Sequence, residues 1–79
     1  MPDINITSLR VQTGSNLIVG RKIRDANIRK EYNINILAIQ RGEHYITHIE
    51  ADTVVHQHDI LYLAGSPEAI ATFHEKIRL

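Results

Sequence analysis

The sequence predicts one small α+β domain, with the order strand, short helices, three strands and helix. Three observations lead to this prediction. The chain has 79 residues, which form one hydrophobic core and are too few for a second, so residues 1–79 make a single domain. Hydrophobic residues make up 43% of it and charged residues 23%, as in ordinary globular domains. The spacing of apolar residues alternates between the periods of strands and helices.

The first strand is predicted at residues 3–11. Its apolar residues first fall on even positions, Ile4 and Ile6, and then on odd ones. Successive side chains of a strand face opposite ways, so we interpret this change of parity as a bulge or bend near residues 7–8. The Thr-Gly-Ser-Asn sequence at 13–16 predicts a turn.

One or two short helices are predicted at residues 20–32, where isolated apolar residues stand among charged ones. Ala26 and Ile28 do not share one helical stripe, so we expect a break near Asn27. Five of the nine basic residues fall between positions 21 and 30, with a single acid among them. A solvated helical face and a local anion site both explain such a run.

Three strands are predicted next. Residues 34–41 are β-branched and apolar at both parities, as in a central strand. A tight turn at 41–43 leads into a second strand at 44–49, so the two form a hairpin. The last strand covers residues 60–64, and Gly65 ends it.

The closing helix has the clearest boundaries. Ser66 is a good N-cap, and Pro67 suits the first helical position. Ile70, Phe73 and Ile77 repeat at the i, i+3 and i+7 positions, which predicts one face that packs on a sheet.

Several kinds of chemistry lack their sequence signatures. The absence of cysteine excludes disulfides, thiolate metal sites and cysteine nucleophiles. No phosphate-binding glycine loop and no serine nucleophile elbow is present, so we expect no catalytic residues and no enzyme. A net charge of zero and only four aromatic residues argue against nucleic acid as a partner. Without a membrane-spanning run or a signal peptide, we expect a soluble, cytoplasmic domain.

Five histidines suggest a metal site as an alternative. His56 and His58 are two positions apart, so on one strand they share a face and can chelate zinc or nickel, with Asp59 or Glu43 as an oxygen ligand. The pair lies among polar residues before a strand, where surface histidines are expected anyway. We therefore predict no metal site and keep a divalent-cation sensor as an alternative function.

A small anionic ligand is the functional interpretation of the basic run. Arg29 lies near Asn27 and Asn35. Guanidinium groups suit phosphate oxygens, and asparagine side chains can read purine edges. Nearby isoleucines either cover the face of a base or belong to the core: Ile23, Ile28 and Ile36.

Five segments, in this order and spacing, resemble the C-terminal domain of regulators of potassium conductance, the RCK-C or TrkA-C domain. They are Leu17-Ile18-Val19-Gly20-Arg21-Lys22-Ile23-Arg24, Asn27-Ile28-Arg29, Tyr32-Asn33-Ile34-Asn35-Ile36-Leu37-Ala38-Ile39-Gln40-Arg41-Gly42, Asp52-Thr53-Val54 and Asp59-Ile60-Leu61-Tyr62-Leu63-Ala64-Gly65-Ser66-Pro67-Glu68. The resemblance spans about Ile4 to Ile77. It implies a βαβββα module that forms a homodimer through its helices, with a cleft across the two-fold axis.

The resemblance also implies a function. Such modules belong to potassium channels, potassium uptake systems and cation–proton antiporters, and some bind cyclic di-AMP in the cleft. A two-fold symmetric dinucleotide suits a two-fold symmetric dimer, because each half meets the same residues. We therefore expect a cytoplasmic domain of, or attached to, an inner-membrane transport protein, with cyclic di-AMP as regulatory ligand and no cofactor. A purely structural dimerisation module is the alternative.

The resemblance assigns ligand contacts to residues 27–29 and 35–36. It implies that Arg29 pairs with a phosphate, Asn35 reads adenine and the isoleucines cover the bases. Asn27 stands where the family often has aspartate, which puts any contact through a carboxylate there in doubt and removes a negative charge near the phosphates. The full predicted set is Ile23, Arg24, Asn27, Ile28, Arg29, Asn35, Ile36, His44 and Ala51.

Overall fold

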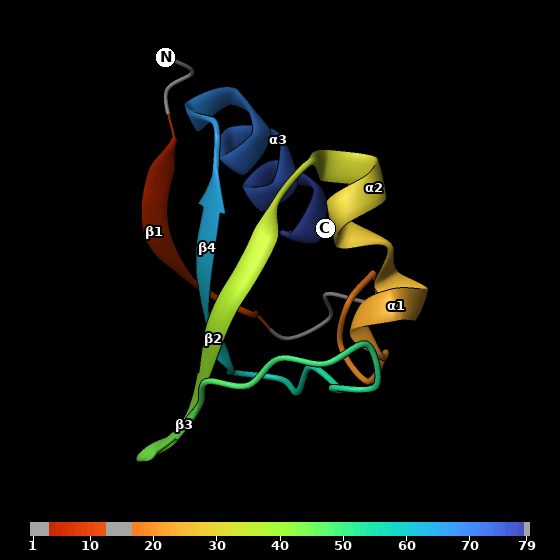
Figure 1. The fold of residues 1–79 in the computed structure, drawn as a ribbon, viewed down its shortest axis with the longest axis vertical. Coiled ribbons are helices and arrows are strands. Elements are labelled where there is room, and N and C mark those ends of the chain that lie inside the picture. Colours follow the sequence, from red (N-terminus) through yellow and green to blue (C-terminus); the bar gives the residue numbers. More distant parts are fainter. Residues whose placement is uncertain (1–3, 13–16, 79) are drawn as a thin grey trace.

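The computed structural model describes residues 4–12 and 17–78, so the turn predicted at 13–16 lies outside the described residues. Figure 1 shows the elements. They are β1 (Asn5–Arg10), α1 (Ile23–Ala26), α2 (Ile28–Tyr32), β2 (Asn35–Arg41), β3 (His44–Ile46), β4 (Ile60–Gly65) and α3 (Pro67–Ile77). This order of a strand, short helices, three strands and a helix confirms the predicted α+β fold class. None of these helices has the length and apolar character to cross a bilayer.

The four strands form one antiparallel sheet in the order β1-β4-β2-β3. The last strand in sequence, β4, is therefore central, and its Leu61 and Leu63 are completely buried. The helices all lie on one side of the sheet (Figure 1). The core between the two layers contains mostly branched aliphatic side chains: Val11, Ile18, Ile28, Ile34, Ile39, Val55, Leu61, Leu63, Phe73 and Ile77.

Helix α3 covers the sheet as its apolar repeat predicts. Phe73 and Ile77 are buried, and Ile70 packs against the core. The Ser66 hydroxyl accepts a hydrogen bond from the Ala69 N–H at 3.0 Å, which confirms the predicted N-cap. The ring of Phe73 also meets the ring of Tyr32 edge-on, at 5.2 Å between centroids, and this contact connects α3 to α2.

Strand β1 differs from its prediction. It pairs with β4 in continuous register over its whole length, so the bulge predicted near residues 7–8 is wrong. The parity changes for another reason. Leu9 and Val11 face the core, whereas Ile4 and Ile6 are 67% and 71% exposed. Because β1 is an edge strand and the helices cover only one face of the sheet, isoleucines at the other parity stay exposed.

The predicted hairpin exists, but its second strand is shorter than expected. β3 ends at Ile46 instead of residue 49, and it pairs only with the last three residues of β2. A register shift between Ile36 and Ala38 places a bulge in β2 itself. Among the described strands, none pairs with the first half of β2 on the side where β3 lies.

An ion pair between the half-buried Arg41 and the buried carboxylate of Asp59 joins the sheet to the loop before β4. Arg41 donates from Nε and Nη2 to the two carboxylate oxygens of Asp59, at 2.9 and 2.8 Å. Nη2 also donates to the carbonyl oxygen of Val54 at 2.9 Å. The same carboxylate accepts the His56 N–H at 2.8 Å, and the Asp59 carbonyl oxygen accepts the Val11 N–H at 2.8 Å. The Asp59 side chain, which is 1% exposed, therefore connects β2 to the loop, and the Asp59 carbonyl oxygen connects the loop to Val11, just after β1.

The ionisation of Asp59 depends on this pairing. Burial by itself raises the pKa of the Asp59 carboxyl, because it disfavours the charged form. The hydrogen bonds from Arg41 and from the His56 N–H, together with the charge of Arg41, outweigh burial and lower the pKa below its ordinary value. The carboxylate is therefore charged at neutral pH and contributes to stability there.

We predict that Asp59→Asn lowers the free energy of unfolding by about 3 kcal/mol, since it leaves Arg41 without its carboxylate. The folded-state pKa of Asp59 is below the unfolded value of about 3.9, so its contribution is complete above that pH and declines as the pH falls further. Urea denaturation between pH 7 and pH 3 measures this. The difference from wild type should shrink below about pH 4. Asp25→Asn, at an exposed position, is the control; an equal loss there would contradict the prediction.

Candidate ligand-binding site

The start of α1 is held against the loop that precedes β4. The Ile23 N–H donates to the Thr53 carbonyl oxygen at 2.8 Å, and the Arg24 N–H donates to the Ala51 carbonyl oxygen at 3.1 Å. A four-residue helix has no stability of its own, so these bonds from the loop fix its position. They bring Ala51 next to Ile23 and Arg24, although almost thirty residues separate them in sequence.

Asn27 forms the predicted break between the helices. Its backbone is left-handed, with φ 57° and ψ 33°, a conformation that asparagine tolerates better than most residues. Its N–H donates to the Ile23 carbonyl oxygen and ends α1, while its own carbonyl oxygen accepts the Glu31 N–H in α2. Asn33 ends α2 in the same conformation, with φ 56°. The chain therefore changes direction twice within seven residues.

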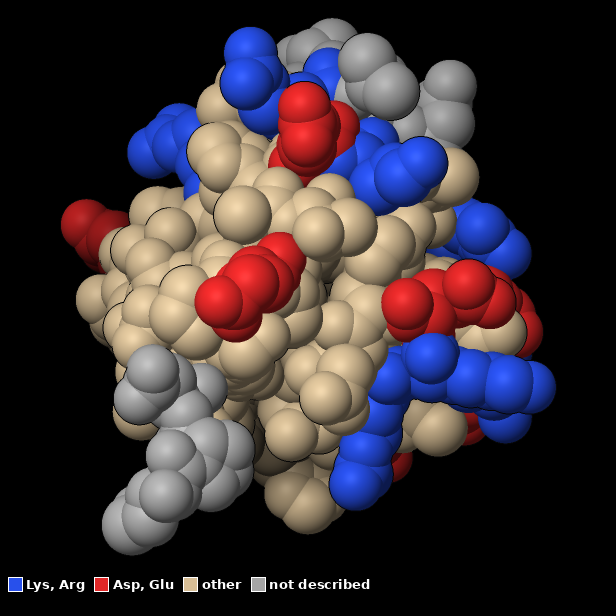
Figure 2. Space-filling view, turned by 90° about the horizontal axis from the view of Figure 1, so that it is seen from above, with Lys and Arg blue, Asp and Glu red and all other residues tan. Residues whose placement is uncertain are grey.

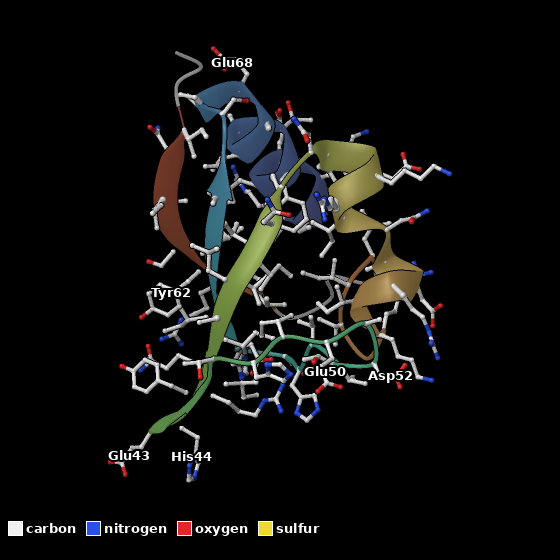
Figure 3. All side chains as sticks on the ribbon, in the orientation of Figure 1. Glu43, His44, Glu50, Asp52, Tyr62 and Glu68 are labelled. Atoms are coloured by element: carbon white, nitrogen blue, oxygen red, sulfur yellow. The ribbon has the colours of Figure 1, made fainter. Side chains whose placement is uncertain are left out.

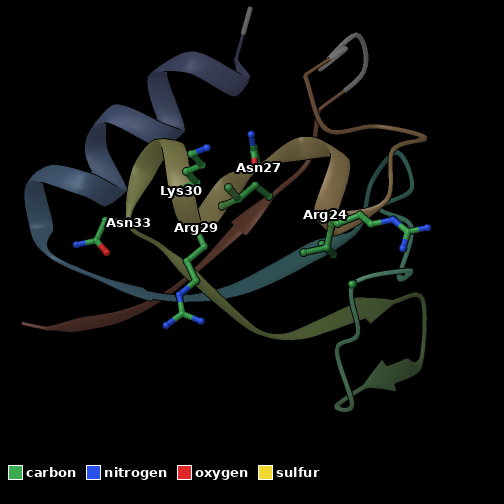
Figure 4. Close-up of a pocket in the computed structure, with 8 residues that line it drawn as sticks. Arg24, Asn27, Arg29, Lys30 and Asn33 are labelled. Carbon is green, nitrogen blue, oxygen red and sulfur yellow. The ribbon is translucent and has the colours of Figure 1, made fainter.

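Two hollows lie along this bent segment. The first, which we call the helix hollow, has a volume of about 510 Å³ and is lined by Ile23, Arg24, Asn27, Ile28, Arg29, Lys30, Asn33 and Ala51 (Figure 4). The second, the sheet hollow, has about 230 Å³ and is lined by Ile23, Ile28, Arg29, Ile34, Asn35, Ile36, Ile49, Glu50 and Ala51. Because they share four lining residues, the two hollows adjoin.

Eight of the nine predicted site residues line one or both hollows. The exception is His44, which lies at the projecting tip of the β2–β3 hairpin, away from the labelled Glu50 and Asp52 (Figure 3). Ile28 is almost completely buried and belongs to the core, whereas Ile23 and Ile36 are half-buried and leave apolar surface in the hollows.

The predicted set lacked five lining residues: Lys30, Asn33, Ile34, Ile49 and Glu50. Lys30 belongs to the basic run, and Asn33 follows a short helix where an asparagine cap is common, so both had a local signal. Glu50 had none, because it lines the sheet hollow only through the long-range folding of its loop against α1.

The helix hollow is lined by three cationic side chains and no carboxylate. Arg24 is paired with Asp52, at 2.9 Å from Nη2 to Oδ1. Arg29 and Lys30 form no ion pair within residues 4–12 and 17–78. Figure 4 shows the Arg24 and Arg29 side chains extending in different directions, from α1 and α2. Among the described residues no carboxylate occupies the guanidinium of Arg29, so it is available to an anion from outside the chain.

Elsewhere the charges are mixed. Figure 2 shows acidic side chains next to basic ones over the face it presents, and the described residues there form no broad area of one sign. The two spaced histidines, His56 and His58, are exposed. In the described part of the chain no three metal-ligating side chains gather, and both oxygens of Asp59 already accept hydrogen bonds.

The family model of the TrkA-C domain matches residues 6–78. The Ktr system potassium uptake protein C of Bacillus subtilis (strain 168) is 40% identical over 60 residues, which are 76% of this chain and 27% of that protein. The chain thus spans about a quarter of that relative's length.

Two solved structures share the fold. One is the RCK C domain of the potassium transport protein KtrA in complex with cyclic di-AMP, with a TM-score of 0.81 and 29% identity over 92% of this chain and 82% of that one. The other is an RCK_C domain dimer of S. agalactiae BusR with cyclic di-AMP, with a TM-score of 0.85, 19% identity and coverage of 92% and 95%. BusR has also been solved with its promoter DNA. At 19–20% identity BusR supports the fold alone, so the absence of a nucleic-acid partner stays a prediction.

The left-handed backbone of Asn27 gives a test of the site's framework. Asn27→Gly should change the free energy of unfolding by less than about 0.5 kcal/mol, because glycine adopts this conformation without strain. Asn27→Val should lower it by about 1–2 kcal/mol. Lys30→Val, on the exposed side of α2, controls for the helix propensity of valine. If Asn27→Val and Lys30→Val lower the free energy of unfolding equally in urea denaturation, the helix break does not depend on the left-handed conformation of Asn27.

Proposed function

The chain belongs to the TrkA-C (RCK-C) domain family, and from this premise we propose that it is a ligand-sensing regulatory domain of a bacterial potassium transporter or cation–proton antiporter, with cyclic di-AMP as its ligand. Family membership agrees with the prediction that the chain is no enzyme. The Bacillus subtilis relative is a potassium uptake protein, and the KtrA domain holds cyclic di-AMP. Both are related closely enough in sequence to support the proposal.

The observation that carries the proposal is Arg29, which lines both hollows and has no acidic partner among residues 4–12 and 17–78. Its guanidinium can give a phosphate oxygen two parallel hydrogen bonds. The half-buried Ile23 and Ile36 offer apolar surface for a base, and Asn35 offers an amide for its edge. A cationic group beside apolar surface and a few polar groups is the combination that a nucleotide requires.

The ligand's symmetry connects the site to a homodimer. Cyclic di-AMP has two equivalent halves, so two copies of the chain related by a two-fold axis would each hold one half with the same residues. The first half of β2, which among the described strands has β4 on one side and none on the other, borders the sheet hollow through Asn35 and Ile36. We place the partner protomer on this side, where it would cover the ligand from the other face.

Such a site regulates transport through conformational populations. A ligand shifts the balance between an active and an inactive transporter only by its difference in affinity for the two. A domain whose ligand lies between two protomers supplies this difference directly, because the ligand binds tightly only when both protomers are in place.

Titration calorimetry tests the proposal. Cyclic di-AMP should bind, whereas cyclic di-GMP and AMP should bind at least about ten-fold more weakly, since they lack one or more of the matched contacts. Arg29→Ala should abolish binding while the thermal unfolding midpoint changes little, because the side chain is exposed and forms no ion pair with the described residues. Arg10→Ala, on the edge strand β1, is the matched control and should bind as wild type does.

Two outcomes would contradict this function. One is the absence of heat with cyclic di-AMP at high micromolar protein. The other is undiminished binding by Arg29→Ala. A stable dimer whose unfolding temperature no nucleotide shifts would favour the purely structural dimerisation module instead.

A further inference from the structure

We propose that Asp52 is an internal competitor of the anionic ligand: it occupies Arg24 in the ligand-free chain and thereby weakens binding at the helix hollow. The inference rests on the proposed function of that hollow and concerns how its affinity is set. Arg24 lines the helix hollow, whereas Asp52 does not. The ion pair, at 2.9 Å, therefore holds one of the hollow's three cations from outside it.

The backbones on both sides of this pair are fixed. Arg24 is anchored by its N–H bond to the Ala51 carbonyl oxygen. Asp52 lies in a tight turn in which the Thr53 N–H donates to the Glu50 carbonyl oxygen at 3.1 Å and the Glu50 N–H donates to the Thr53 hydroxyl at 2.9 Å. Breaking the ion pair thus needs only side-chain rotation, with no movement of the loop.

The pair is weak enough for a ligand to replace. The Arg24 and Asp52 side chains are 54% and 67% exposed, and exposed ion pairs contribute little because water and salt screen them. A phosphate oxygen can accept the same charge-assisted hydrogen bond from Arg24 that the carboxylate accepts, so the ligand can take the place of Asp52. After displacement the Asp52 charge still lies within a few ångströms and repels the bound phosphate.

Arg29 provides an internal contrast. No acid in the described chain pairs with it, so a phosphate reaches it without displacing a carboxylate. The same loop carries a second acid, Glu50, which lines the sheet hollow and is bound to His48 at 3.1 Å. The loop at residues 50–52 therefore places a negative charge on each side of Ala51, at the rim of an otherwise basic site.

The consequence is an affinity below the maximum that the cations could provide. Removing the Asp52 charge should raise affinity, because Arg24 then meets the ligand unpaired. The gain should match the strength of an exposed ion pair, which corresponds to about two- to five-fold in the dissociation constant. It should also decrease with salt, since the interaction is screened over about 10 Å at 0.1 M.

Calorimetry with cyclic di-AMP on the full chain tests this at low and at physiological salt. Asp52→Asn should bind about two- to five-fold tighter than wild type at low salt. Glu43→Gln removes an equal charge at the hairpin tip, across the molecule from Asp52 (Figure 3), and should change affinity much less. Arg24→Gln should weaken binding. Adding Asp52→Asn to Arg24→Gln should then give a smaller gain than it gives alone, because the competition acts through Arg24.

The outcomes separate the two proposals. Binding by wild type with unchanged or weaker binding by Asp52→Asn would overturn the competitor role and leave the proposed function standing. Equal gains from Asp52→Asn and Glu43→Gln would also overturn it, since only net charge would then matter. If neither wild type nor Asp52→Asn binds, the proposed function fails and this inference fails with it. Thermal denaturation of each variant verifies that the chain is folded. Asp52→Ser removes the same charge by a second substitution and should give the same gain in affinity as Asp52→Asn.

Discussion

The ion pair between Arg41 and the buried carboxylate of Asp59 is the interaction on which the candidate site depends. One carboxylate receives the guanidinium of β2 and a backbone N–H from its own loop. Arg41 in addition holds the Val54 carbonyl oxygen. The stretch from Ala51 to Val55 is thereby given a fixed course, and α1 is hydrogen-bonded to that stretch. The position of the ligand hollows thus follows from a salt bridge that does not touch them.

This arrangement explains why the site consists of very short elements. α1 and α2 contain four and five residues, too few to persist alone, and each ends at a left-handed asparagine. Long-range bonds supply the stability that the helices lack. The sharp bends allow polar side chains from three sequence regions to meet at one place, which a single long helix would prevent.

The sequence predicted those parts of the fold that depend on local patterns. The cap at Ser66, the apolar face of α3 and the break at Asn27 follow from neighbouring residues, and the structure has all three. The first strand was misinterpreted because Ile6 is apolar without being buried, which parity alone does not reveal. The Asp59 carboxylate accepts a local backbone N–H, as acids in turns commonly do, but its main partner Arg41 is eighteen residues away and no local pattern identifies that pair.

The exposed isoleucines of β1 have a consequence for the behaviour of the chain in solution. Ile4 and Ile6 lie at an edge strand whose outer backbone groups have no strand beside them among those described. The chain also has a net charge of zero, so copies approaching one another meet no overall electrostatic barrier. Exposed apolar edge strands on molecules that do not repel one another favour self-association. These two features together lower the colloidal stability of the chain near neutral pH.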